Sequence, residues 1–490
     1  MKTKENAYLT VYLALCLTLV LSLCLTLIEG ARRNGARLEA EIAAEVSLQS
    51  VLAEYHRELL CQYNIFAVDS SYGTNLPGKA NTERRLKYYL EKNLDFRDVF
   101  LGSLFYRDFF ALSPGDVSLV KTSVLTDGGG AVFRSCAADA IRDDVGFNLL
   151  PKLQDWIRVI EVNGLEERDL EAEKSSLDSE IQEYDGMEID TGDEEPYILR
   201  VINPTASLEA QRRKGILKLV LGEDGALSGN SIQTAGLVHD RMRRGRVNRG
   251  NMDIPQLSEG ELLWEGFLFR EYLLRYMGHY GKESDEDALR YQVEYLAAGE
   301  ESDAENLRSV LKRICVIREA ANTMYLYSDP DKRGVAELAA SLVCDLAMVP
   351  ELAPVLEAAI LLGWAYAESI YDIKTLLSGG KVPLVKDSQT WHYGLNAALS
   401  GELRGQEDAG EGLSYEDYLR LFMMCTDTDL LTARAMNMVE ADIRLTPGNG
   451  AFCLDGCFAG MEAYMEVESG YGFGFEVTRR RAYINGKGSR

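Results

Sequence analysis

NAYLTVYLALCLTLVLSLCLTLI, residues 6–28, is a run of 23 residues without a formal charge. A helix of this length spans about 34 Å, enough to cross the roughly 30 Å hydrocarbon core of a bilayer. Tyr8 and Tyr12 lie near one end of the run, where aromatic rings favour the membrane interface. The run therefore predicts a single transmembrane helix whose partner is the lipid bilayer.

A cleaved signal peptide is the alternative interpretation of this run. The apolar part of a signal peptide has only about 7–15 residues and ends at a small-x-small cleavage site. The run here is longer, and Ile28-Glu29-Gly30 is a poor cleavage site. A buried core helix is disfavoured because the segment is apolar on every face and lies at the terminus. We therefore expect an uncleaved anchor.

The helical pattern continues beyond the run, and the first proline of the chain is Pro77. Apolar residues recur at roughly helical spacing among acidic and basic ones: Leu38, Ile42, Val46, Leu48, Leu52, Tyr55 and Leu59. This predicts one long helix from the anchor to about Cys61, with an amphipathic outer half that packs onto the globular part. A hydrophobic spine that becomes amphipathic outside the membrane is also how pilin-like proteins begin.

Composition excludes some classes of function. The 490 residues carry a formal net charge of −25, which argues against nucleic-acid binding because that requires Lys and Arg to neutralise phosphates. The four histidines show no zinc or metalloprotease spacing. The triple glycine at 128–130 lacks the residues of a phosphate-binding loop, and the sequence contains no nucleophile elbow. We expect no cofactor, no metal and no catalytic residue, and the sequence alone does not indicate a reaction.

The pattern of charge and hydropathy predicts an α+β fold that is predominantly helical, with a small mixed sheet and a C-terminal helical bundle. We expect the following order: 1–30, membrane anchor; 31–160, long helix and membrane-proximal α+β region; 161–260, acidic connector, short strands and basic loop; 261–445, helical bundle; 446–490, strand or hairpin region.

The connector is the most acidic part of the chain, with 15 acidic and 2 basic residues between 161 and 195. A solvated connector explains it, since the acidic residues lack the spacing of a calcium-binding loop. Residues 197–202 and 216–221 are expected to be strands. A basic cluster follows within nine residues: Arg241, Arg243, Arg244, Arg246 and Arg249. It is interpreted as a mobile loop or as a contact to anionic headgroups or wall polymers.

The bundle has one segment, 351–377, that is apolar enough to suggest a second membrane span. Only ten uncharged residues lie between Glu357 and Glu368, far short of about 20. We therefore predict the central buried helix of the bundle. At the C-terminal end, Phe473, Phe475 and Val477 alternate with Gly and Glu, which predicts a strand that pairs with the early strands.

Two of the nine cysteines lie in the anchor, and the remaining seven are an odd number. Most of the seven lie on apolar helix faces, which indicates buried thiols. Cys453 and Cys457 are the one close pair; if that stretch is helical they share a face and could form a disulfide. A zinc site there would need two further ligands, which the sequence does not indicate.

Five stretches carry a family resemblance: YLTVYLALCLTLVLSLCLTLIEGAR, AEYHRELLCQYNIFAVDSSYG, RYQVEYLAAGEESDAENLRSVLKRICVIREAANTMYLYSD, GWAYAESIYDIKTLLSGGKVPLVKD and GYGFGFEVTRRRAYI. They resemble a family of uncharacterised Gram-positive membrane proteins that is often encoded beside tight-adherence (Tad/Flp) pilus genes. The resemblance covers most of the chain, with the acidic centre least similar. The opening also looks like the anchor of TadE/TadG-like pseudopilins, although no Gly-Glu pair heads the apolar run.

The resemblance helps to orient the chain, because positive charges on the two sides of the anchor nearly balance. Lys2 and Lys4 precede it, and Arg32, Arg33 and Arg37 follow it. We expect the N-terminus inside and the C-terminal domain outside the cell. The resemblance implies a single-pass, surface-exposed structural protein, a pseudopilin-like component in contact with pilus or secretion machinery. Two alternatives stay open: an envelope-acting hydrolase, and a sensor or ligand-binding module that uses a pocket in the bundle.

Overall fold

The computed structural model describes residues 2–74, 76–95, 110–145, 149–189, 197–201, 203–222, 227–401 and 411–483. The chain divides into two compact units. Unit 1 comprises Met1–Ala140, Gly236–Leu262 and Ile443–Arg490, and unit 2 comprises Ile141–Ala235 and Leu263–Asp442. Within the described part, the predicted fold class is confirmed: it is predominantly helical, with a long apolar N-terminal helix and a small sheet.

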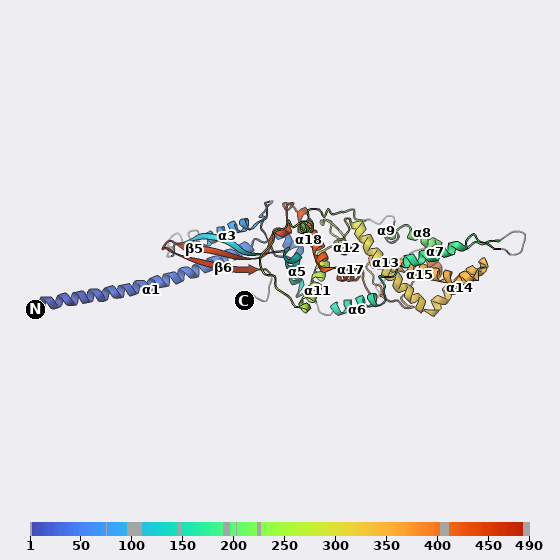
Figure 1. Ribbon diagram of the computed structural model, residues 1–490, viewed down its shortest axis with the longest axis horizontal. Coiled ribbons are helices and arrows are strands. Elements are labelled where there is room, and N and C mark those ends of the chain that lie inside the picture. The colour runs from blue at the N-terminus through green and yellow to red at the C-terminus, as the bar shows by residue number, and fades with distance from the viewer. Residues whose placement is uncertain are drawn as a thin grey trace. The chain divides into compact units, whose positions relative to one another are not determined.

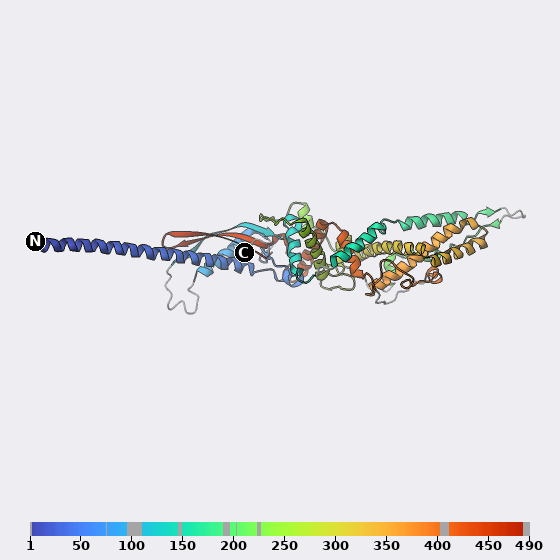
Figure 2. The ribbon, with the colours of Figure 1, turned by 90° about the horizontal axis from the view of Figure 1, so that it is seen from below.

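Helix α1 (Lys2–Leu52) is continuous over 51 residues. Every residue from Tyr8 to Ile28 is exposed, and this half extends beyond the rest of unit 1 in both views (Figures 1 and 2). The outer half buries one face at helical spacing: Ala36, Ala40, Ala44, Leu48 and Val51. The predicted extension to Cys61 is wrong, because the chain turns after Leu52 and α2 (Arg57–Tyr63) begins with His56 as its N-cap.

The sheet of unit 1 joins the two ends of the chain. Its strands are β1 (Val68–Asp69), β2 (Leu112–Val124), β5 (Cys457–Ser469) and β6 (Phe473–Ala482). β5 pairs with β1, β2 and β6, so the predicted C-terminal strand reaches the early strands through β5. All these pairings are antiparallel, whereas we expected a mixed sheet.

One face of this sheet is covered by the outer half of α1 and by α3 (Lys79–Leu94). The apolar core between them includes Ala40, Leu48, Leu86, Leu90 and Met465. The remaining elements of unit 1, or shared with unit 2, are α5 (Asp127–Ile141), α10 (Val238–Arg243), α11 (Glu259–Tyr276), α18 (Thr428–Leu445) and the short 3-10 helix η3 (Leu454–Gly456).

Unit 2 is built around α13 (Asp303–Ser328) and α15 (Ala353–Leu377), which pack side by side. α15 buries residues on every side, including Leu361, Trp364 and Ala367, as expected for the central helix of a bundle. Within the residues that the structure describes, two helices are long and apolar enough to cross a membrane, Tyr8–Leu52 and Pro350–Leu377. The most apolar window of the second is 72% buried and that of the first is 0% buried, so the second is a core helix.

Around these two helices lie α6 (Leu149–Val162), α7 (Leu170–Tyr184), α8 (Ala206–Arg212), α9 (Ile216–Leu221), α12 (Gln292–Ala298), α14 (Pro330–Ala347), η2 (Pro350–Leu352), α16 (Leu395–Ser400) and α17 (Tyr415–Cys425). A two-stranded ladder joins β3 (Glu188–Ile189) to β4 (Tyr197–Ile198).

One strand prediction is wrong: Ile216–Leu221 is the helix α9. A short apolar run does not by itself distinguish a strand from a buried helix. Here Gly215 and Gly222 bound the run with positive φ values of 84° and 79°. Ile216, Leu217 and Leu219 are buried, and α9 lies against α13 and α15. Packing against those two helices therefore decides its conformation.

Candidate ligand-binding pocket

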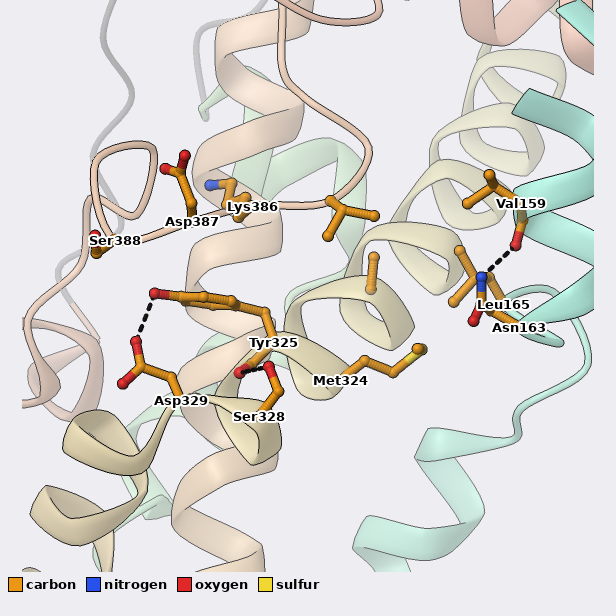
Figure 3. A pocket seen from close by; sticks show the side chains of 12 residues that line it. Val159, Asn163, Leu165, Met324, Tyr325, Ser328, Asp329, Lys386, Asp387 and Ser388 are labelled. Atoms are coloured by element: carbon orange, nitrogen blue, oxygen red, sulfur yellow. Dashed lines mark hydrogen bonds between the residues drawn. The ribbon is translucent and has the colours of Figure 1, made fainter. Parts of the chain in front are cut away.

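A pocket of about 550 Å³ lies in unit 2, and we call it the α13 pocket. The end of α6, the last turns of α13 and a loop after α15 converge on it (Figure 3). Its lining residues are Val159, Asn163, Leu165, Ala321, Met324, Tyr325, Ser328, Asp329, Val385, Lys386, Asp387 and Ser388. The volume is in the range of small-molecule sites.

The first carboxylate of the α13 pocket is Asp329, between α13 and α14. The Tyr325 hydroxyl donates to Asp329 Oδ2 at 2.6 Å, as the dashed line in Figure 3 shows. Asp329 Oδ1 accepts the backbone N–H groups of Asp331 and Lys332 at 3.1 and 3.2 Å, which caps α14. The hydrogen bond from Tyr325 and those from the backbone lower the pKa of Asp329. Asp329 is therefore ionised at neutral pH.

The second carboxylate, Asp387, lies on the loop after α15. The Thr390 hydroxyl and backbone N–H both donate to Asp387 Oδ1 at 2.9 Å. These bonds, and one from the Gln389 N–H, lower the pKa of Asp387. Both pocket carboxylates are thus anionic at neutral pH, and neither is suited to act as a general acid there.

The rest of the α13 pocket is mainly apolar. Val159, Leu165 and Ala321 contribute to it, together with Met324 and Val385. Met324 is 38% exposed and Val385 is 65% exposed, although both are large apolar side chains. A ligand that covers them removes apolar surface from water, which is favourable. The combination fits a ligand with an apolar body and a cationic group.

A buried cluster of charges holds the loop that carries Asp387. The side chain of Lys386 is fully buried, and its ammonium group pairs with Glu368 and with Asp372 Oδ1, the latter at 2.5 Å. Arg318 Nε donates to Asp372 Oδ2 at 2.9 Å. The two cations and the two carboxylates balance, as buried charges require. We call Arg318, Glu368, Asp372 and Lys386 the buried quartet.

The buried quartet also binds the backbone of the loop. Arg318 donates to the carbonyl oxygens of Pro383 and Leu384 at 2.7 and 3.0 Å. Glu368 accepts the N–H groups of His392 and Tyr393 at 3.0 and 2.8 Å. Burial raises the pKa of Glu368, but hydrogen bonds from His392 and the charge of Lys386 outweigh it, and the pKa falls to about 2. The loop is thereby fixed to α13 and α15.

Sequence reasoning did not find this arrangement. Glu368 marked the end of a run too short to span a membrane, but it was not paired with a partner. One feature of the sequence does indicate buried charges. Glu368 and Asp372 are four residues apart, so they share a face of the most apolar helix outside the N-terminal run. Buried carboxylates there require buried cations, and Arg318 and Lys386 supply them.

The predicted anionic-surface cluster lies in and after α10. Arg241 is largely buried and its guanidinium donates to Asp455 Oδ1 at 2.5 Å. Arg244 pairs with Asp240 at 2.9 Å. Arg243, Arg244, Arg246 and Arg249 are exposed. Four of the five arginines are thus accessible, and contact with an anionic surface stays a prediction.

The predicted cysteine pair flanks η3. Cys453 is the residue before this 3-10 turn, and Cys457 is buried at the start of β5. The stretch is therefore not the helix in which the two would share a face. Both are present as thiols, and the Cys457 Sγ contacts the Cys453 carbonyl oxygen at 3.6 Å. Their disulfide stays a prediction.

Other titratable groups do not add a second chemistry to the pocket. Among the described residues, no group of three His, Cys, Asp or Glu side chains is placed to hold a metal ion. Burial raises the pKa of Glu294 and Glu319 to about 7, but neither lines the α13 pocket. These two carboxyl groups with strongly raised pKa values therefore lie outside the lining of the α13 pocket.

The structure defines a class of protein: a long apolar N-terminal helix joined to an antiparallel sheet, and a helical unit with a pocket. Residues 195–469, more than half of the chain, match the model of a family of unknown function, DUF5702. The chain belongs to this family, so the expected likeness to a family without an established activity is confirmed. No curated protein and no solved structure matches the chain.

Proposed function

We propose that the chain is a single-pass membrane-anchored protein with a structural or assembly role at the cell surface. One observation carries the proposal: from Tyr8 to Ile28, α1 exposes its side chains on all faces, whereas its outer half is packed into unit 1. Exposing such a run to water is unfavourable, and a bilayer removes that cost. Arg32 and Arg33 follow where the run ends, as is common at a membrane boundary.

The finer proposal is a pseudopilin-like component of Tad pilus assembly or secretion. Its support is the resemblance of the N-terminal stretches and the layout of α1, an apolar spine that becomes amphipathic. Its partners would be the bilayer, through residues 6–28, and pilus or secretion machinery. The exposed arginines of and after α10 offer a further contact to anionic headgroups or wall polymers.

Two measurements on intact cells test the proposal. Alkaline extraction should leave the full chain in the membrane fraction, and protease added from outside should digest the C-terminal unit. Release by alkali would overturn the anchor, and complete protection in cells that are shown to be intact would overturn the surface location. For the pilus role, a clean deletion should reduce piliation, and normal pili in that strain would contradict it.

A second function, ligand binding, is favoured by the α13 pocket. Asp329 is already in an ion pair with Lys332 at 3.9 Å, so the ionised and exposed Asp387, together with the exposed apolar residues, is what favours a cationic amphiphile. In calorimetry with the full chain in detergent, n-octylammonium should bind and octanoate should not. Equal binding of both ions, or of neither, would contradict this function. The hydrolase alternative is less favoured, because it requires a carboxylic acid with a raised pKa in the pocket.

A further inference from the structure

The turn between β5 and β6 lies beside the residues that follow the apolar run of α1. The Arg32 guanidinium carbon is 3.0 Å from the centroid of the Tyr471 ring, and that of Arg33 is 5.4 Å from the Phe473 ring. Contacts between cations and aromatic faces at these distances are attractive. The turn, residues 470–472, and the start of β6 therefore lie beside Arg32 and Arg33 of α1.

Further contacts fix this position. Gly470 donates its N–H to the Ala111 carbonyl oxygen at 2.8 Å, and the Ser469 hydroxyl donates to the Phe110 carbonyl oxygen at 2.7 Å. A Cβ atom at Gly35 would lie 2.8 Å from the Phe110 ring, so α1 passes very close to this end of the sheet. The position of the turn along α1 thus depends on several independent contacts.

The opposite end of β6 confirms its direction along α1. Arg479 and Arg481 pair with Glu45 at 3.7 and 2.7 Å, and the Tyr483 hydroxyl donates to the Leu52 carbonyl oxygen. Residues later in β6 therefore contact residues later in α1. The hairpin thus points its turn back toward the apolar half of the helix.

The distances place the turn at the height of lipid headgroups. Ile28 ends the uncharged run, and Arg32 lies four residues further, which is about 6 Å along a helix. The headgroup layer on each side of a bilayer is roughly 5–8 Å thick. With residues 6–28 in the hydrocarbon core, the Tyr471 ring lies at this layer. Tyr471 is 49% exposed, and tyrosine rings favour the interface.

We propose that the β5–β6 turn rests on the bilayer surface, with Tyr471 and Arg32 in contact with phospholipid headgroups. The contact limits how far unit 1 can tilt on its anchor. It rests on the proposed function, because it requires α1 to span the membrane. The partner is the lipid itself, and continuity with the anchor is what identifies it.

The test replaces Tyr471 by the photo-crosslinking residue p-benzoylphenylalanine in the full chain, reconstituted in phosphatidylglycerol-containing vesicles. The control carries the same residue at Tyr88 on α3, which is 48% exposed and thus closely matched. The neighbouring Tyr89 donates to Glu54 at 2.7 Å, just after the end of α1 at Leu52, and Leu52 is about 30 Å beyond Arg32 at the rise of a helix. Irradiation should give a phospholipid adduct at position 471 and none at position 88.

The outcomes separate this contact from the anchor. Absence of an adduct at position 471, in protein that resists alkaline extraction, would overturn the contact and leave the anchor intact. Equal adducts at both positions would also overturn it, because α3 would then be as near to lipid as the turn. Release of the protein by alkali would overturn both proposals. Unchanged proteolytic fragments in both variants would show that the fold is retained.

Discussion

Lys386 Nζ lies 2.5 Å from Asp372 Oδ1, and both side chains are almost completely buried. Lys386 also pairs with Glu368, and Arg318 with Asp372. Each charge in this quartet is balanced only as long as the others stay in place. Such a cluster contributes little net stability compared with an apolar core, but loss of one member is costly. In this protein the buried quartet holds the loop that carries Asp387 at the rim of the α13 pocket.

Replacement of Lys386 by methionine should destabilise unit 2 strongly. The change keeps the packing of the long side chain but leaves Glu368 and Asp372 with one cation between them. We expect a loss of about 3–5 kcal/mol in the free energy of unfolding. The measurement is urea unfolding of the full chain in detergent, followed by tryptophan fluorescence. Lys381→Met, at an exposed position nearby, should stay within about 0.5 kcal/mol; equal effects of the two changes would contradict the role of the quartet.

The stability of unit 2 should fall between about pH 4.5 and pH 7 because of Glu294. Its Oε1 accepts the Tyr280 N–H at 2.9 Å and the Tyr415 hydroxyl at 2.7 Å, and Oε2 is buried without a hydrogen bond. Burial raises the pKa of Glu294 from 4.5 to about 7. In this range the unfolded chain has lost the proton that the folded chain keeps, so unfolding becomes easier as the pH rises.

The control for this pH dependence is Glu294→Gln, which cannot ionise and retains an oxygen for both donors. This variant should have a shallower decline between pH 4.5 and pH 7 and should be more stable than the wild type at pH 8. The difference is expected to be on the order of 3 kcal/mol, since one pKa unit corresponds to about 1.4 kcal/mol. The measurement is the urea midpoint as a function of pH. Parallel profiles of the two proteins would show that Glu294 does not titrate as described.

The sequence predicted the elements whose signal is local. The apolar run before Glu29 and the roughly helical spacing after it are patterns within one segment, and they predicted a helix that α1 forms as far as Leu52. The predicted apolar face is wrong in part, because Leu38, Ile42 and Val46 are exposed. The buried face is instead formed mainly by small residues such as Ala36, Ala40 and Ala44, which allow close packing against the rest of unit 1. The burial of α15 could likewise be predicted from one segment, because a helix that is apolar on every side is expected to lie in a core. The helix α9 was missed because Ile, Leu and Val in a six-residue run suit a strand as well as a buried helix.

The pocket and its charged support could not be predicted from one sequence. Asp329 ends α13, whereas Asp387 lies on a loop 58 residues later (387 − 329), and Val159 comes from α6. These residues meet only because α13, α15 and α6 pack together. The pairing of Arg318 with Asp372 likewise spans 54 positions. With 77 acidic residues in the chain, charge alone does not select those that become buried.

Leu48→Ala should test whether the outer half of α1 is part of unit 1. Leu48 is fully buried against the sheet and α3, so its truncation leaves a cavity. We expect a loss of about 2–5 kcal/mol, together with faster proteolysis of unit 1. Ile42 lies on the same helix and is 52% exposed, so Ile42→Ala should have little effect. A small effect of Leu48→Ala would mean that α1 does not pack as the structure shows.

Asp387→Asn should weaken the binding of n-octylammonium to the α13 pocket while leaving the fold intact. Asp387 is exposed at the rim and ionised, so its charge attracts a cationic group, and its replacement by an amide removes that attraction. Because an exposed ion pair contributes modestly, we expect an affinity about two- to fivefold lower, with a weaker dependence on salt. Asp331→Asn is the matched control, since Asp331 is exposed on α14 but does not line the pocket. The measurement is calorimetry of n-octylammonium binding at two salt concentrations. A loss of affinity confined to Asp387→Asn would locate the cationic group at this rim. Identical affinities of the two variants would show that Asp387 does not contact the ligand.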